Sequence, residues 1–404
     1  MSTLPLAPPV YQRILVVTLA DLGDTLLITP ALQALRAAQP NARISLLTTP
    51  VGAAALRDLP LYDELMIFEK QRFNSPRELL RPTNLRAAWG LWRQLRRVRY
   101  DACVLLHHLT TWFGTLKYAA LNAASGAPRR FGLDNGRGFF LTDPVADGGF
   151  GARHQAEYWL ALIALLAPPA AAAPAPLPCV ALPPAGDSAV SATFERIDPQ
   201  RPLIALHPGS GAFAPARRWP VTRFAALADA LIDDGAQLVL VGGPEEAELR
   251  QRMLQGMRRA AAVIDLGGRT GLSDLAYVFA QCDLFVGNDS GLAHLAGAAG
   301  APVVAIFGPT DPHAWGPYGG MSWEPLQQLS NGVEVLHSGR HRALKATIAC
   351  SPCIYRGHRL GTPNGCPDRT CLLRIDVDQV LALVRQQLAE QTQLCGSTIS
   401  STKS

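Results

Sequence analysis

The stretch Arg13–Ala38, which reads RILVVTLADLGDTLLITPALQALRAA, decides the fold class of this 404-residue chain. It opens with a continuous run of β-branched and aliphatic residues over Arg13–Thr18, which is typical of a strand buried on both faces of a parallel sheet. A short turn over Ala20–Asp24 leads into a helical pattern over Thr25–Ala38. Strand and helix patterns go on alternating after this stretch, and that rhythm predicts a doubly wound α/β sheet.

A second series of the same kind begins at Leu203, after a segment of different composition. Between Ala167 and Gly186, seven of the twenty residues are proline and most of the others are alanine. This segment predicts a linker between two α/β domains that face each other across a cleft. The predicted boundaries are 1–168 for the first domain, 169–190 for the linker, 191–375 for the second domain and 376–394 for a C-terminal helix that packs back on the first domain.

The composition excludes several classes of protein. Hydrophobic residues make up 48% of the chain and charged residues 17%, which excludes intrinsic disorder and a coiled coil. The net charge of +5 is consistent with anionic partners, but no motif that reads nucleic acid accompanies it. The longest apolar run, Tyr158–Ala167, is too short to span a bilayer, and no signal-peptide pattern opens the chain, so we expect a cytoplasmic protein.

Polar and glycine-rich turns follow four predicted strands, at the positions where open α/β sheets bind their ligands. Asp24 follows the first strand and either caps the next helix or acts as a general base. Ser210 and Gly211 end a turn, HPGSG, whose small residues let backbone N–H groups approach a phosphate. Arg217 and Arg218 come next, and their fork-shaped guanidinium groups suit a diphosphate.

The third and fourth turns are also polar and glycine-rich. The turn Gly287–Gly291 opens a predicted helix, and His294 follows one helical turn later. Such a helix start binds anions through its dipole and its unpaired N–H groups, and a simple capping turn is the alternative. The fourth turn, Phe307–Asp311, is also glycine-rich and polar. The four turns together predict an anion site at the strand ends.

Three blocks of the sequence resemble a known family. Leu22–Ile44, His207–Pro220 and Gly287–Gly319 are similar, in this order, to blocks of glycosyltransferase family 9, the lipopolysaccharide heptosyltransferases. The resemblance implies a GT-B architecture of two Rossmann-like domains. It also implies an enzyme that inverts the anomeric centre without a metal or any other cofactor.

The resemblance also implies roles for individual residues. Asp24 matches the position of the family's catalytic base, and Glu245 or Glu246 lies near the nucleotide ribose. Two arginines stand where the family often has a lysine, and either cation can meet a phosphate. The residues that would hold the donor's diphosphate are Ser210, Gly211, Arg217, Arg218, Asp289, Ser290, Gly291 and His294. The implied donor is ADP-heptose, and the implied acceptor is a lipopolysaccharide core or another lipid-linked saccharide.

Other functions remain open at this point. A GT-B nucleotide-sugar epimerase would convert the donor without an acceptor, and a non-catalytic binding protein would hold the donor without turning it over. A nicotinamide-dependent dehydrogenase is disfavoured, because the turn after the first strand lacks the G-x-G-x-x-G pattern.

Two patterns resemble metal sites. Cys350 and Cys353 have zinc-knuckle spacing, but Cys366 and Cys371 are separated by four residues. We therefore expect reduced cysteines packed in a loop and no bound metal. The D-x-D pattern Asp376–Asp378 precedes an amphipathic helix, so we interpret it as a helix cap.

The segment Lys70–Tyr100 carries nine basic residues and one acidic residue. Its apolar residues fall at helical spacing, at Leu85, Ala88, Trp89, Trp92 and Leu95. We favour a crossover helix packed on the sheet over a helix that lies on an anionic membrane. Its basic outer face would still help the protein approach a negatively charged, lipid-linked acceptor at the inner membrane surface.

Overall fold

The structure, a computed structural model, describes residues 10–166, 175–184, 188–195, 197–211 and 213–401. Its contacts divide the chain into two units. Unit 1 is Met1–Val180 with Gly357–Arg359, and unit 2 is Ala181–Arg356 with Leu360–Ser404. The division falls inside the predicted linker 169–190, of which residues 169–174 and 185–187 lie outside the described part.

Unit 1 is built on a six-stranded sheet in the order β3-β2-β1-β4-β5-β6. All five strand pairs are parallel, and this order is that of the Rossmann fold. The central strand β1 is buried from its second residue onward, as its aliphatic run predicted. The strands are β1 (Arg13–Thr18), β2 (Arg43–Thr48), β3 (Glu64–Ile67), β4 (Ala102–Leu105), β5 (Arg129–Asp134) and β6 (Asp143–Ala146).

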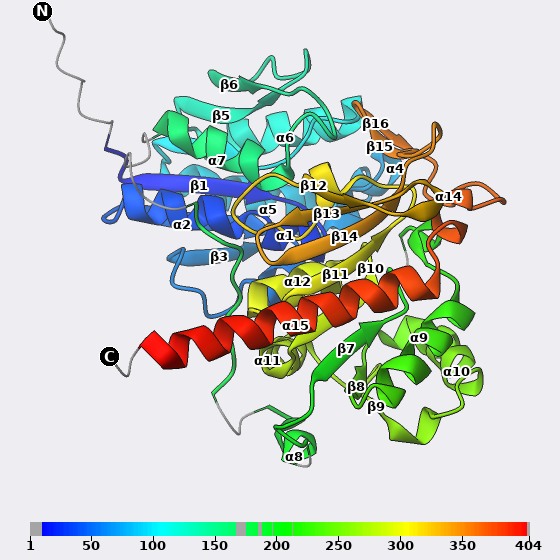
Figure 1. Ribbon diagram of the computed structural model, residues 1–404. Coiled ribbons are helices and arrows are strands. Elements are labelled where there is room, and N and C mark those ends of the chain that lie inside the picture. The colour runs from blue at the N-terminus through cyan, green and yellow to red at the C-terminus, as the bar shows by residue number, and fades with distance from the viewer. Residues whose placement is uncertain (1–9, 167–174, 185–187, 196, 212, 402–404) are drawn as a thin grey trace, which may run out of the picture. The chain divides into compact units, whose positions relative to one another are not determined.

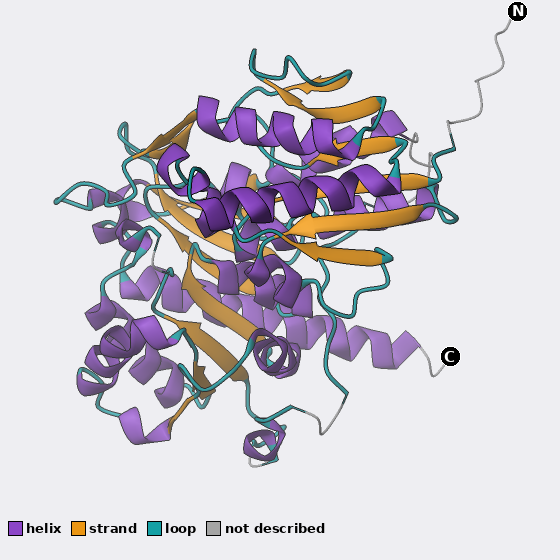
Figure 2. Ribbon diagram, turned by 180° about the vertical axis from the view of Figure 1, so that it is seen from behind, coloured by secondary structure: helices purple, strands orange, loops and turns teal. Residues whose placement is uncertain are grey.

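Helices cover both faces of this sheet. Helices α2 and α7 pack together on one face (Figure 1), and α5 and α6 pack together on the other (Figure 2). The helices of unit 1 are α1 (Leu22–Leu26), α2 (Thr29–Ala38), α3 (Pro50–Ala55), α4 (Pro76–Leu79), α5 (Pro82–Val98), α6 (Trp112–Ser125) and α7 (Gln155–Leu166), with a 3-10 turn η1 (Lys70–Phe73). The expected crossover helix is thus α5, whose Leu95 is buried in the core beneath the sheet.

The first helical segment of unit 1 differs from the prediction. The helix expected over Thr25–Ala38 is two helices, because α1 ends at Leu26 and α2 begins at Thr29. Pro30 lies in the first turn of α2. Proline has no N–H to continue an earlier helix, but it is well suited to a first turn.

Unit 2 repeats the same arrangement and extends it. Its eight-stranded sheet has the order β12-β13-β14-β11-β10-β7-β8-β9. Six neighbouring strands, in the order β14-β11-β10-β7-β8-β9, are parallel and follow the Rossmann order. The strands β13 and β12 are antiparallel additions next to β14. The doubly wound α/β prediction is therefore confirmed in both units. The strands are β7 (Leu203–His207), β8 (Gln237–Leu240), β9 (Val263–Asp265), β10 (Leu284–Asn288), β11 (Val303–Phe307), β12 (Glu324–Gln328), β13 (Val333–Ser338) and β14 (His341–Ala346), with a separate hairpin of β15 (Ile354–Arg356) and β16 (Arg359–Gly361).

The edge strand β12 is exposed along its whole length. It contains Pro325, and its pairing with β13 shifts register between Pro325 and Gln327. Proline cannot donate to a sheet ladder and is therefore confined to edges and irregular positions.

The helices of unit 2 also lie on both faces of their sheet. Helices α9 and α10 pack together, as do α11 and α12. The helices are α8 (Ser191–Phe194), α9 (Val221–Asp233), α10 (Ala247–Gln255), α11 (Leu272–Gln281), α12 (Gly291–Ala299), α13 (Pro312–Trp315), α14 (Thr370–Leu373) and α15 (Val377–Ser401), with 3-10 turns η2 (Pro215–Arg217), η3 (Pro244–Glu246), η4 (Ala260–Ala262) and η5 (Ser330–Gly332). No helix of the described residues is both long enough and apolar enough to cross a membrane.

The C-terminal helix α15, red in Figure 1, packs against α9 of unit 2. Val380, Leu383 and Val384 on its inner face are buried in the core of that unit, and Arg385 pairs with Asp234 beyond the end of α9. We expected this helix to pack on the first domain, but its contacts assign it to unit 2.

Candidate functional site

Three of the predicted turns meet in unit 2, because β7, β10 and β11 are adjacent parallel strands. Asn288, the last residue of β10, is fully buried and joins two of these turns. Its side-chain oxygen accepts a hydrogen bond from the N–H of Trp219 at 2.8 Å. Its side-chain amide donates to the carbonyl oxygens of Pro208 at 2.8 Å and Gly209 at 3.0 Å. The turn after β7 is thus fixed to the end of β10.

Glu246 lies beneath the glycine-rich turn after β7, with its side chain almost fully buried. Its Oε1 accepts hydrogen bonds from the N–H groups of Ser210 and Gly211, both at 2.9 Å. A Cβ atom on Gly209 would lie 1.9 Å from the same oxygen, so any larger residue there would displace the Glu246 carboxylate. Gly211 has a φ of +72°, which also favours glycine. The two N–H groups expected to bind a phosphate are therefore bonded to Glu246 in this structure.

The ionisation of Glu246 follows from these contacts. Burial alone raises the pKa of a carboxyl group, but the hydrogen bond and charge of His207 and the N–H groups of Gly211 and Gly243 outweigh it. The pKa of Glu246 is lowered from 4.5 to about 2. Glu246 is therefore a carboxylate at neutral pH, and it acts as the acceptor at the centre of the turn.

A chain of hydrogen bonds connects Glu246 to helix α12. His207 Nε2 lies 2.9 Å from Glu246 Oε2, and because a carboxylate only accepts, Nε2 carries the proton. His207 Nδ1 lies 3.2 Å from Ser290 Oγ, within hydrogen-bonding distance. Ser290 is the N-cap of α12, and its Oγ also accepts from the N–H of Ala293. The helix expected after the turn Gly287–Gly291 is present, and Ser290 caps it.

Two arginines and an aspartate connect the first turn to the others. Arg217 donates to the carbonyl oxygen of Ser210 at 3.1 Å and to Asp289 Oδ2 at 3.3 Å. Asp289 also accepts a 2.6 Å hydrogen bond from Thr310, which is fully buried in the fourth turn. Arg218 donates to the carbonyl oxygen of Gly211 at 3.0 Å. Each guanidinium group has five N–H donors, so these contacts position both arginines without using all their donors.

His294 and Glu245 lie at opposite extremes of exposure. His294 is buried in α12, and burial lowers its pKa to about 4, although the charge of Asp289 acts in the other direction. It is therefore a neutral hydrogen-bonding group at neutral pH. Glu245 is exposed in the turn after β8, with its carboxyl group next to Gly243. Of the two glutamates expected near a ribose, Glu246 is hydrogen-bonded to the turn after β7, and Glu245 is exposed to solvent.

Asp24 belongs to unit 1, where it lies in the first turn of α1. The N-cap of this helix is Asp21, whose side chain makes no capping hydrogen bond. Asp24 is partly buried at the carboxyl end of β1. Capping was the alternative role for Asp24, and the helix start at Leu22 leaves it inside the helix rather than at the cap.

Comparison with known protein families gives one decisive match. The sequence model of "Glycosyltransferase family 9 (heptosyltransferase)" matches residues 88–331, which is more than half of the chain and includes residues of both units. The chain belongs to glycosyltransferase family 9. The expected family is thus confirmed, and the three turns of unit 2 lie inside the matched segment.

Curated relatives and solved structures agree with this membership. Among the family 9 relatives, lipopolysaccharide heptosyltransferase 2 of Escherichia coli K12 is 36% identical over 129 residues, 31% of this chain and 37% of that protein. A lipooligosaccharide heptosyltransferase 2 of Haemophilus influenzae is 38% identical over 28% of this chain and 33% of that protein. The chain thus aligns with about a third of the length of these relatives.

Two solved structures cover almost the whole chain. The structure titled E. coli ADP-heptose lps heptosyltransferase II has a TM-score of 0.69 at 24% identity and covers 94% of this chain and all of that one. E. coli heptosyltransferase WaaC with ADP has a TM-score of 0.64 at 18% identity and covers 93% of this chain and all of that one. They confirm the GT-B fold class of two Rossmann-like units.

The remaining metal predictions concern the C-terminal third of this family 9 chain. Within the described residues, no group of three or more His, Cys, Asp or Glu side chains is placed to hold a metal ion. Cys350, Cys353, Cys366 and Cys371 are free thiols, and burial raises the pKa of Cys353 and Cys371. Asp376 precedes α15, where its N–H is bonded to Gln379 Oε1 at 2.9 Å, an arrangement typical of a helix start.

The sequence did not single out three residues that organise the site. Asn288, Thr310 and His207 hold the turns together, and each lies within one of the predicted turns. Their positions at strand ends were the available signal.

Proposed function

We propose that the protein is an inverting glycosyltransferase that transfers a heptose from ADP-heptose to a lipopolysaccharide core or another lipid-linked saccharide. The match to the family model over residues 88–331 carries this proposal. Support for the donor comes from relatives named lipopolysaccharide heptosyltransferases and from a neighbour whose structure contains ADP. The connected turns of unit 2 add a chemical reason, since they bring two arginines and a helix N-terminus to adjacent strand ends.

In the proposed reaction, the acceptor hydroxyl attacks the anomeric carbon and loses its proton to the carboxylate of Asp24. The bond from that carbon to the diphosphate breaks, and ADP leaves with the bonding electron pair. Arg217 and Arg218 stabilise the charge that develops on the diphosphate, together with the N-terminus of α12. Asp24 lies before the residues that the family model matches, so its role rests on the resemblance of Leu22–Ile44 and on its position after β1.

The proposal includes no metal and no other cofactor, because the arginines and the helix N-terminus supply the positive charge. His294, neutral at neutral pH, would donate a hydrogen bond to the diphosphate rather than a charge. We place the enzyme in the cytoplasm, in peripheral contact with the inner surface of the membrane that carries its acceptor.

An assay of the purified protein with ADP-heptose tests the proposal. ADP release should require a heptose-deficient lipopolysaccharide core, should persist in EDTA, and should give a product of inverted anomeric configuration. Conversion of the donor without any acceptor would indicate an epimerase instead. Donor binding without turnover under any condition would indicate a binding protein.

A further inference from the structure

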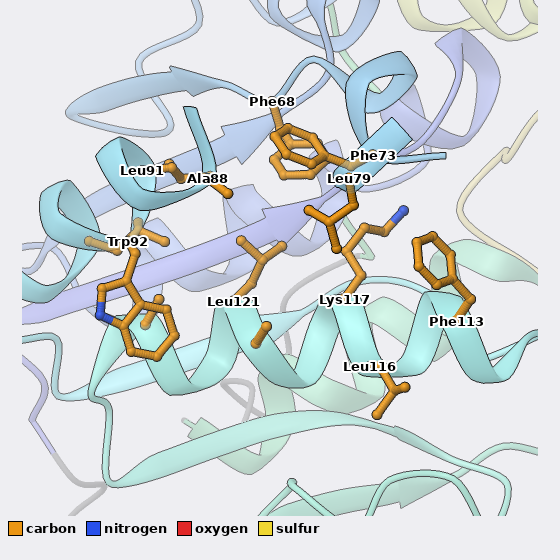
Figure 3. Close-up of a pocket in the computed structure, with 13 residues that line it drawn as sticks. Phe68, Phe73, Leu79, Ala88, Leu91, Trp92, Phe113, Leu116, Lys117 and Leu121 are labelled. Carbon is orange, nitrogen blue, oxygen red and sulfur yellow. The ribbon is translucent and has the colours of Figure 1, made fainter. Parts of the chain in front are cut away.

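Unit 1 contains an apolar pocket of about 300 Å³ between α4, α5 and α6 (Figure 3). Twelve of its thirteen lining residues are apolar. Phe68, Phe73 and Leu79 close one side, and Leu121 of α6 faces them (Figure 3). The volume is at the lower end of the range for small-molecule sites, and the lining is suited to a hydrocarbon chain.

The thirteenth lining residue is Lys117 of α6. Its ammonium group lies 5.4 Å from the ring centre of Tyr118 and 6.0 Å from that of Phe68. The described residues give it no hydrogen bond and no ion pair. Burial lowers the pKa of Lys117, and the positive charge of Lys70 lowers it further. A cation in an apolar pocket, next to another cation, is stabilised by an anionic partner.

Exposed apolar side chains surround the pocket, as on a helix that faces a membrane. Helix α5 lines the pocket with Ala88, Leu91, Trp92 and Leu95, at the spacing of one helical face. Next to this face, Trp89 is 62% exposed, and on α6 the lining residue Leu116 is 58% exposed. Tryptophan side chains are enriched at the interface between a membrane and water.

The opposite face of α5 is basic. Arg86, Arg93 and Arg97 form one exposed stripe, because they are separated by seven and four residues along the helix. The described residues give these three side chains no ion pair. A helix with apolar, tryptophan-bearing and basic faces in this order is typical of proteins bound to anionic lipid surfaces.

We propose that this pocket binds one acyl chain of an anionic membrane lipid, with Lys117 paired to the lipid's acidic headgroup and the α5 arginines on neighbouring headgroups. The proposal gives a location to the membrane contact included in the proposed function. It does not require sugar transfer, so the test measures lipid binding with no sugar substrate present.

Quenching of tryptophan fluorescence by brominated acyl chains tests whether a chain enters the pocket. The full chain is mixed with phosphatidylcholine vesicles that contain phosphatidylglycerol brominated on its acyl chains. Trp92 lines the pocket, so the chain should quench it, and Trp92→Phe should remove that part of the quenching while preserving the apolar lining. Trp89→Phe is the matched control, because Trp89 lies outside the pocket on the exposed side of the same helix. This variant should leave the quenching of Trp92 unchanged. Quenching that Trp92→Phe leaves unchanged would mean that lipid touches only the outer surface, and the proposal would be wrong.

Sedimentation with vesicles tests the charged part of the proposal. The protein should bind vesicles that contain phosphatidylglycerol and not vesicles of phosphatidylcholine alone. Lys117→Gln should weaken this binding about fivefold, as expected for one basic residue at an anionic surface. Arg252→Gln, which removes one exposed charge from α10 of unit 2, should leave it unchanged.

Three results would overturn the proposal. Equal binding to both kinds of vesicle would exclude the acidic headgroup, and no binding to either would exclude the membrane. A stable dimer in which Trp92 is protected from the brominated lipid would mean that a second copy of the chain covers the pocket.

Discussion

The two units share a strand order and a buried pair of histidine and carboxylate at the carboxyl edge of the sheet, but they use the pair differently. In unit 1, His108 Nδ1 lies 3.0 Å from Asp147 Oδ2, and Asp147 also accepts from the N–H of Gly149, two residues along its own loop. In unit 2, Glu246 accepts from His207 and from the N–H groups of a different turn, 35 and 36 residues away. In unit 1 the pair also bonds the side chains of Asn135 and Gln155, and Gly149 in its own loop supplies the N–H group. In unit 2 the carboxylate instead fixes the backbone of the glycine-rich turn after β7. The comparison teaches that the chemistry of these sheets depends on what their turns carry, not on the shared topology.

The largest expected effect concerns the turn after β1, the only one of the four predicted turns in unit 1. Asp24→Asn should lower the rate of sugar transfer by about 10²–10⁴-fold, because an amide cannot take the acceptor's proton. ADP affinity should stay unchanged, since the proposed donor residues belong to unit 2. Steady-state kinetics and calorimetry with ADP measure the two quantities.

Asp21→Asn is the matched control for this variant. It lies three residues earlier, is exposed, and caps α1 without a side-chain hydrogen bond. It should retain transfer activity. Near-normal turnover of Asp24→Asn would exclude Asp24 as the base. It would also contradict the proposal that unit 1 supplies the base and unit 2 binds the donor.

The next effect compares the two buried carboxylates directly. Glu246→Gln and Asp147→Asn each replace a carboxylate that accepts several hydrogen bonds, so each should lower the free energy of unfolding by about 3 kcal/mol. Only Glu246→Gln should also weaken ADP binding, because only Glu246 shapes the turn with Ser210 and Gly211. Urea denaturation and calorimetry provide the two measurements. An equal loss of ADP affinity in Asp147→Asn would show that the two pairs do not differ in role.

Acid should weaken unit 2 through Glu246. Its folded pKa of about 2 lies below the ordinary value of 4.5 that applies to the unfolded chain. The stabilisation is therefore complete above about pH 4.5 and is lost as the pH falls toward about 2. Unfolding measured by urea at a series of pH values should show this loss, and Glu246→Gln should make the curve flatter in that range. A curve identical to that of the unchanged protein would contradict the assignment.

The smallest expected effect concerns Glu245. If this exposed carboxylate binds the ribose of the nucleotide, Glu245→Ala should weaken ADP binding about tenfold, the value of one hydrogen bond to a charged group. Glu248→Ala, which removes an exposed carboxylate from α10, is the control and should bind ADP normally. Equal affinities of the two variants would exclude Glu245 as a ribose ligand.

The sequence predicted the parts of the fold that depend on local patterns. The bounds of β1 agree with the prediction residue for residue, and β7 begins at Leu203, where the second series was expected to begin. Continuous aliphatic runs mark strands that are buried on both faces of a sheet. The hairpin that adds β12 and β13 was not predicted, because β12 is short, fully exposed and contains a proline.

The site was predicted less completely, for a physical reason. The strand ends identified the turns that form the site. Arg217, which follows β7, does contact Asp289 after β10, and Ser290 contacts His207 at the end of β7. Burial, however, is a property of the folded chain, so the sequence could not reveal that Glu246 lies under Gly209 rather than in solvent. The hydrogen bond from Thr310 to Asp289 joins residues at the ends of two strands, and only the packed sheet brings them together.

The exposed strand β12 has a consequence for the behaviour of the protein at high concentration. An open sheet edge is a template on which another molecule can add a strand, and such additions lead to aggregation. Pro325 interrupts the row of N–H donors along this edge, and the register shift beside it disturbs the regular spacing that an incoming strand would need. The added hairpin therefore ends the sheet of unit 2 with a strand that resists intermolecular pairing, and replacing Pro325 with a β-branched residue would make the protein more prone to assemble edge to edge.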